Sequence, residues 1–110
     1  MKKVTAGMDI LGDFAPKFGE LNDEVLFGQV WSREEQLSPR DRSLITVSAL
    51  MASGILDNSL KGHIARAKEN GVTREEMVEV LTQLAFYAGG PKAWAAFYMA
   101  KEIYDRILRM

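Results

Sequence analysis

Apolar residues recur every three or four positions along most of the chain, a spacing typical of helices that bury one side. The clearest stretch runs from Met77 to Ala88, where six apolar residues at helical spacing share one side. No window alternates apolar and polar residues between hairpin turns, so strands are not expected. The pattern predicts an all-α fold of about five or six helices, forming one domain over residues 1–110.

Helix boundaries follow from the residues that start and stop helices. Ser38-Pro39 is a strong helix start, and Thr73 with Glu76 forms a capping box. Gly54 and the pair Asn70-Gly71 are typical helix ends. The expected elements are a short piece before Pro16, helices over about 17–28 and 39–53, a helix opened by Asp57-Asn58-Ser59, a helix after Thr73, and a last helix after Gly89-Gly90-Pro91. Residues Gln29 to Leu37 have no long period and are expected to be a connector.

Composition and charge narrow the range of possible partners and locations. The 110 residues contain 14 Lys and Arg and 15 Asp and Glu, a net charge of −1. This balance gives no field that would attract nucleic acid or an anionic membrane, so neither is an expected partner. The N-terminal residues lack the apolar core of a secretory leader, and no apolar stretch approaches the ~20 residues of a membrane span. We therefore expect a cytoplasmic protein.

Cysteine is absent, which excludes disulfides, thiolate nucleophiles and cysteine-based metal sites. With a single histidine, His63, a metal site is not expected either. His63 lies beside Leu60 and Ala67 on its helix, and two interpretations stay open. The commoner is a partly buried structural histidine, and the other is a general acid or base.

Arg40 and Arg42 stand at a helix N-terminus, where the helix dipole disfavours cations. They form either a solvated first turn, with Asp41 pairing one arginine, or a site for a carboxylate. Tyr87 precedes the Gly89-Gly90 turn and could present its hydroxyl to a pocket. Core packing is nevertheless the expectation for it and for the other aromatic residues near the turns, namely Trp31, Phe86, Trp94, Phe97 and Tyr98.

Several of these segments resemble the γ-carboxymuconolactone decarboxylase family. The resemblance rests on the run from Leu37 to Leu50, on Gly62-His63, on Asn70 to Glu76 and on Leu84 to Pro91, and covers about residues 20–108. It implies the helical fold of alkyl hydroperoxidase D, a cytoplasmic location and a homo-oligomer, commonly a trimer or hexamer. The peroxidase motif Cys-x-x-Cys-x-x-x-His, laid on His63, places Leu56 and Ser59 at the cysteine positions. Thiol-dependent peroxidase activity is therefore excluded.

The resemblance implies a carboxy-lyase of aromatic catabolism that needs no cofactor or metal. It would convert 4-carboxymuconolactone to 3-oxoadipate enol-lactone in the β-ketoadipate pathway. We expect His63 and Arg42 as catalytic residues and Arg40, Ser59 and Tyr87 as substrate-binding residues. An arginine would hold the acetate arm, an arginine or a backbone N–H would stabilise the enolate, and His63 would protonate carbon. The alternatives are a family member acting on another small acid or lactone, and a non-catalytic helical oligomer.

Overall fold

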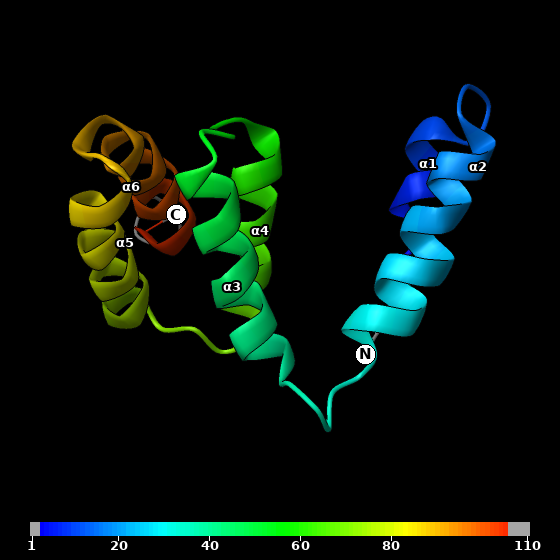
Figure 1. The fold of residues 1–110 in the computed structure, drawn as a ribbon, viewed down its shortest axis with the longest axis horizontal. Coiled ribbons are helices and arrows are strands. Elements are labelled where there is room, and N and C mark those ends of the chain that lie inside the picture. Colours follow the sequence, from blue (N-terminus) through cyan, green and yellow to red (C-terminus); the bar gives the residue numbers. More distant parts are fainter. Residues whose placement is uncertain (1–2, 106–110) are drawn as a thin grey trace. The chain divides into compact units, whose positions relative to one another are not determined.

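The computed structural model describes residues 3–105, and every regular element in this range is a helix, which confirms the all-α prediction (Figure 1). Its elements are six α-helices and one π-helix: α1 (Ala6–Leu11), α2 (Pro16–Glu20), η1 (Leu21–Trp31), α3 (Pro39–Ala52), α4 (Asn58–Glu69), α5 (Arg74–Ala88) and α6 (Gly90–Asp105). None of the helices in this range is both long and apolar enough to cross a membrane.

The chain forms two compact units, divided between Pro39 and Arg40. The N-terminal unit contains α1, α2 and η1, and the C-terminal unit contains the helices from α3 to α6. Each unit is described by itself below. The expectation of one domain over residues 1–110 stays a prediction.

In the N-terminal unit, α1 and α2 touch backbone to backbone. A Cβ atom built on Gly7 would lie 2.5 Å from the carbonyl oxygen of Gly19, so no larger residue fits there without separating the helices. The buried carboxylate of Asp23 accepts hydrogen bonds from the backbone N–H groups of Gly7 (2.8 Å) and Met8 (2.9 Å). Burial alone would raise the pKa of Asp23, but these bonds and one from Asn22 lower it below its usual value. The ionised carboxylate thereby holds the start of α1 against η1.

The predicted connector from Gln29 to Leu37 begins later than expected. Residues 21–31 form one continuous π-helix, η1, so the helix extends through Gln29 and Val30 to Trp31. Phe27 and Trp31 are both buried and stack with ring centroids 5.7 Å apart. Burial of this aromatic pair stabilises a final turn that the sequence period does not show.

The C-terminal unit has a continuous apolar core to which α3, α4, α5 and α6 all contribute. Its side chains are almost inaccessible to solvent: Val47, Met51, Leu60, Ile64, Ala67, Val72, Met77, Leu81, Ala93, Ala96, Ala100 and Ile103. Helix α6 packs against both α4 and α5. The predicted capping box at Thr73 and the cap at Asp57 are both formed, and Gly54 (φ 79°) and Gly71 (φ 97°) end their helices with positive φ. The boundary signals of this half of the sequence are confirmed.

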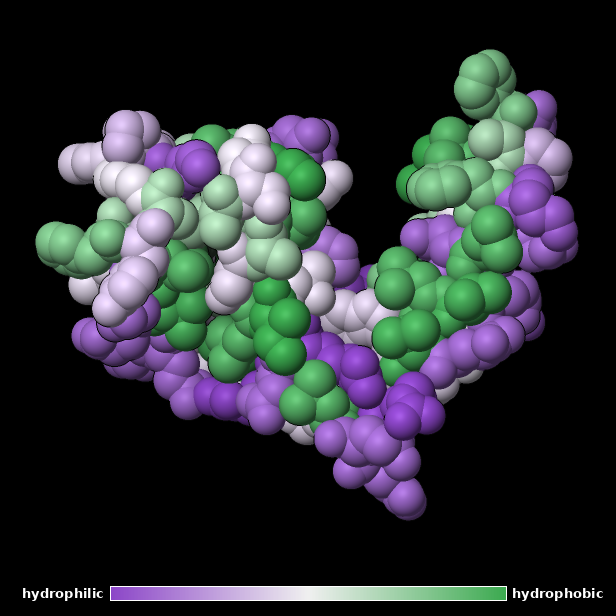
Figure 2. All heavy atoms as spheres, viewed as in Figure 1, coloured by the Kyte–Doolittle hydropathy of each residue, from purple (hydrophilic) through white to green (hydrophobic). Residues whose placement is uncertain are grey.

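The expectation that the aromatic residues near the turns pack in the core is wrong for four of the six. Trp31 is buried and Phe97 is half-buried, but the side chains of Phe86, Tyr87, Trp94 and Tyr98 are between 66% and 87% exposed. These four lie on the outer sides of α5 and α6, because alanines such as Ala93 and Ala96 occupy the inner side of α6. Apolar side chains reach the surface of both units (Figure 2).

Candidate functional site

His63 lies in the second turn of α4, and its surroundings follow from how that helix is built. The Asp57 carboxylate caps α4 by accepting the N–H of Ser59 at 2.8 Å. Leu60 and Ile64 then point into the core and are fully buried. His63 stands at the edge of this buried side, so its ring is half-buried and its Nδ1 atom is shielded from solvent. The structure thus places the imidazole between core and surface.

A row of polar residues runs along α4 on the side of His63. Ser59, His63, Arg66 and Asn70 are spaced by four, three and four residues, which puts them on one side of an α-helix. At the end of the row, the amide of Asn70 donates a hydrogen bond to the buried hydroxyl of Ser43 in α3 at 2.9 Å. The structure therefore brings two predicted site residues, Ser59 and His63, onto adjacent turns of one helix.

The ionisation of His63 is set by its burial and then by the charge of Arg66. Both lower the pKa of His63 below its usual value of 6.5, so the ring is neutral at pH 7 in the protein without ligand. Arg66 is a neighbour of His63 that the sequence analysis did not consider. Its signal was present, because a residue three positions after a histidine on a helix shares its side. Arg66 is half-buried, as His63 is.

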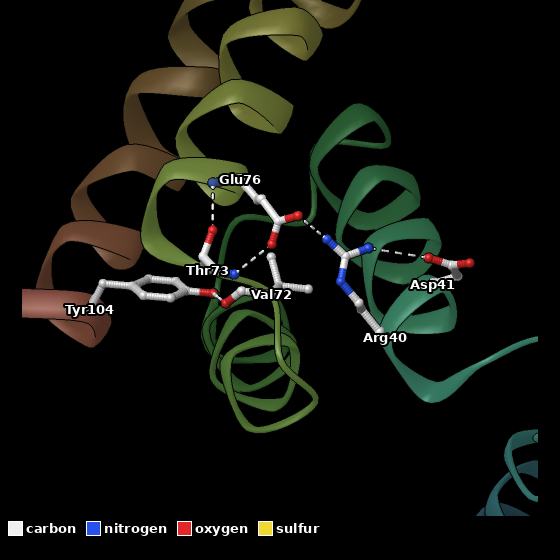
Figure 3. Close-up of polar contacts among 6 residues, drawn as sticks. All are labelled: Arg40, Asp41, Val72, Thr73, Glu76 and Tyr104. Carbon is white, nitrogen blue, oxygen red and sulfur yellow. Dashed lines mark hydrogen bonds and ion pairs between the residues drawn. The ribbon is translucent and has the colours of Figure 1, made fainter.

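Arg40 has a role in holding helices together (Figure 3). Its guanidinium bridges the carboxylates of Asp41, at 3.4 Å, and of Glu76 in the first turn of α5. Glu76 also accepts the N–H of Thr73 at 2.9 Å, and its own N–H donates to the Thr73 hydroxyl at 3.1 Å. The Thr73 N–H lowers the pKa of Glu76 although burial opposes it, and the Thr73 hydroxyl and Arg40 lower it further. The start of α3 is thus tied to the cap of α5.

The register of α3 and α4 separates the two arginines from the histidine along the bundle. Ser43 contacts Asn70, so Arg40 and Arg42 lie near the C-terminal end of α4. His63 lies seven residues before Asn70, which corresponds to about 10 Å of helix. Within one chain, the structure does not assemble Arg40 and His63 into one small site. The roles assigned to Arg40 and Arg42 from the sequence stay predictions.

Tyr87, a predicted substrate-binding residue, occupies the last turn of α5, and its side chain is 82% exposed. A surface pocket of about 200 Å³ does lie between α5 and α6, lined by Arg74, Met77, Val78, Phe97, Ala100, Lys101 and Tyr104. None of the five predicted site residues belongs to this lining. The substrate-binding role expected for Tyr87 therefore also stays a prediction.

No group of three or more His, Asp or Glu side chains within residues 3–105 is arranged to hold a metal ion. The candidate site on α4 is made of three side chains. These are a neutral, half-buried imidazole, a hydroxyl one turn before it and a guanidinium one turn after it. Such a set can bind an anion and transfer a proton.

Comparison with known proteins gives one family and two relatives. The model of the carboxymuconolactone decarboxylase family matches residues 16–102. A 4-carboxymuconolactone decarboxylase of Acinetobacter baylyi is 35% identical over 103 residues, which cover 94% of this chain and 75% of that protein. An uncharacterized 15.0 kDa protein of Paracoccus denitrificans is 29% identical over 82 residues, covering 74% of this chain and 60% of that protein.

Proposed function

Because the chain belongs to the carboxymuconolactone decarboxylase family, we propose that it decarboxylates a small lactone acid without a cofactor, and that this acid is 4-carboxymuconolactone. The name of the Acinetobacter baylyi relative supports this substrate. The observation that carries the proposal is the half-buried imidazole of His63, flanked by Ser59 and Arg66 on one side of α4.

The reaction needs an electron sink and a proton, and the substrate supplies the first. The bond between the ring and its carboxylate breaks, CO₂ leaves, and the electron pair moves through the conjugated double bond into the lactone carbonyl. The resulting enolate takes one proton at carbon to give 3-oxoadipate enol-lactone. The protein therefore has to orient the substrate, stabilise the enolate oxygen and deliver that proton.

His63 is the proton donor in this proposal, although it is neutral before substrate binds. The substrate carries two carboxylates, and negative charge beside an imidazole favours its protonated form. Binding thus raises the pKa of His63 from its lowered value and draws a proton onto the ring. In the same proposal Ser59, one turn earlier, donates a hydrogen bond to this ligand.

The test is decarboxylation of 4-carboxymuconolactone by purified protein, followed by ultraviolet absorbance and by CO₂ release. His63→Gln should lower kcat by roughly 10²- to 10⁴-fold, the usual contribution of a general acid. Glu69→Gln, an exposed change on the same helix, should leave kcat unchanged. Circular dichroism establishes that both variants are folded. Full turnover by folded His63→Gln protein would refute this role.

Self-association forms a second part of the proposal. The exposed side chains of Phe86, Tyr87, Trp94 and Tyr98 give the C-terminal unit more apolar surface than isolated exposed residues would. We propose that other copies of this chain cover them in a homo-oligomer, with a trimer or hexamer expected. Sedimentation at micromolar concentration tests this, and a monomer at all concentrations would refute it.

A further inference from the structure

Arg66 and His63 form an i, i+3 pair on α4, and the pair defines one side of the candidate site. Residues three apart on a helix have Cβ atoms about 5–6 Å from each other and project to the same side. Both side chains are half-buried, so solvent only partly screens their interaction. Within the described part of the chain, Arg66 is the one charged residue that shifts the pKa of His63. The two groups therefore act on the same region of space.

Three more arginines belong to the described part of the C-terminal unit, and each lies at another place in the bundle. Arg40 bridges Asp41 and Glu76. Arg74 pairs with Asp105 at 2.8 Å, beside the pocket between α5 and α6. Arg42 precedes Ser43, whose contact with Asn70 places it near the far end of α4. Arg66 is the arginine that shares the helix and the side of His63.

We propose that Arg66 is the residue that positions the substrate, with its guanidinium binding the carboxylate of the acetate arm while the ring lies against His63. This inference rests on the proposed function and replaces Arg40 in that role. A guanidinium suits the task because it binds a carboxylate through two parallel hydrogen bonds, which fix orientation as well as position.

The acetate arm, rather than the ring carboxylate, is the favourable partner for a fixed cation. The ring carboxylate loses its charge as it becomes CO₂, so a cation held against it would stabilise the substrate more than the transition state. The acetate carboxylate keeps its charge throughout. A cation on the arm therefore binds substrate and transition state equally and does not slow the reaction.

The same arrangement links binding to protonation. In the protein without ligand, the positive charge of Arg66 disfavours a second positive charge on His63. A carboxylate bound to Arg66 cancels that repulsion. The proton required for catalysis is then taken up when the acetate arm is in place.

Steady-state kinetics of Arg66→Gln and Arg66→Lys test the proposal, with Arg74→Gln as a control of equal charge change outside the site. Arg66→Gln should raise KM for 4-carboxymuconolactone roughly 10- to 100-fold and change kcat by less than about threefold. Arg66→Lys should recover part of the loss, and Arg74→Gln should leave KM unchanged. An analogue whose acetate arm is a carboxamide should bind the wild type more weakly and bind Arg66→Gln about as well as the acid does.

An unchanged KM in folded Arg66→Gln protein would overturn the proposal, as would a fall in kcat at constant KM, which would place Arg66 at the enolate oxygen. If the wild type turns over no lactone acid, the proposed function fails but the anion site remains testable. The probe is then a butenolide with the acetate arm and no ring carboxylate, followed by NMR of the His63 ring. A pKa that rises on binding in the wild type, and less in Arg66→Gln, supports the site. An unchanged pKa in both proteins refutes it.

Discussion

Removing the Thr73 hydroxyl tests whether the cap of α5 stabilises the C-terminal unit as its geometry indicates. In Thr73→Ala, the N–H of Glu76 loses an acceptor at 3.1 Å, whereas the bond from the Thr73 N–H to the Glu76 carboxylate at 2.9 Å can persist. The freed N–H lies at the surface and can bind water. The variant therefore loses the free energy of one capping hydrogen bond and leaves no buried polar group without a partner. Such a loss is worth about 1 kcal/mol of unfolding free energy. It corresponds to a decrease of roughly 4–8 °C in Tm for a domain of this size.

Urea and thermal unfolding followed by circular dichroism measure this loss of stability. Two further variants show whether it comes from the cap itself. Thr73→Ser keeps the accepting oxygen and should be close to wild type. Thr82→Ala, on the same helix, removes an exposed hydroxyl that donates to the carbonyl of Val78 at 2.7 Å. Because alanine is the better helix former, this change should be neutral or stabilising by a few tenths of a kcal/mol. If Thr73→Ala and Thr82→Ala shift Tm equally, the hydroxyl of Thr73 is not acting as a cap.

Three further outcomes follow from the structure. Leu81→Ala empties a fully buried position and should lower the unfolding free energy, measured in urea, by about 2–5 kcal/mol. Val78→Ala, at an exposed position of the same helix, should lower it far less. Equal losses in the two variants would contradict the core described above. Burial and the charge of Arg66 lower the pKa of His63 in the folded protein. The unfolding free energy should therefore carry no penalty from His63 above about pH 6.5, the pKa of an unfolded histidine, and should decrease as the pH drops from there toward the folded pKa. His63→Gln should remove that part of the slope in urea unfolding, and identical slopes in both proteins would show that the pKa is not shifted. Trp94→Ser should reduce the sedimentation coefficient of an oligomer that buries this side chain, and an unaltered oligomer would exclude Trp94 from the interface.

Much of the C-terminal unit could be predicted from sequence because its signals are local. A proline at the first position of α3, the capping box at Thr73 and the glycine after Asn70 each act within one helical turn. The last turn of η1 could not be predicted in this way. It depends on the stacking of Phe27 and Trp31 in a buried environment, which outweighs the weak period of residues 29–31.

The candidate site was predictable only in part, because arginine partners are set by tertiary contacts. His63 could be identified from its residue type and its position on the helix. Its half-burial agrees both with a structural histidine and with a general acid or base, the two interpretations that the sequence left open. No local pattern shows that Arg40 bridges to Glu76, which lies 36 residues further along the chain. Arg66 was visible as a helical neighbour of His63, but its relevance depends on where α3 and α4 meet. That register is given by the contact of Ser43 with Asn70.

The backbone contact of α1 with α2 has a consequence for how this sequence can change over evolutionary time. Alanine at Gly7 would meet the Gly19 carbonyl and also the Asp23 carboxylate, whose Oδ1 lies 2.7 Å from the added carbon. A single substitution at Gly7 therefore damages a helix crossing and the anchor of α1 in the same step. A substitution at Asp23 removes the anchor but leaves the crossing closed to larger residues. A larger residue at Gly7 or at Gly19 therefore requires the two helix backbones to separate, and at Gly7 it also displaces the Asp23 carboxylate. At Gly62, where an added Cβ meets no atom within 4 Å, exchanges can accumulate independently.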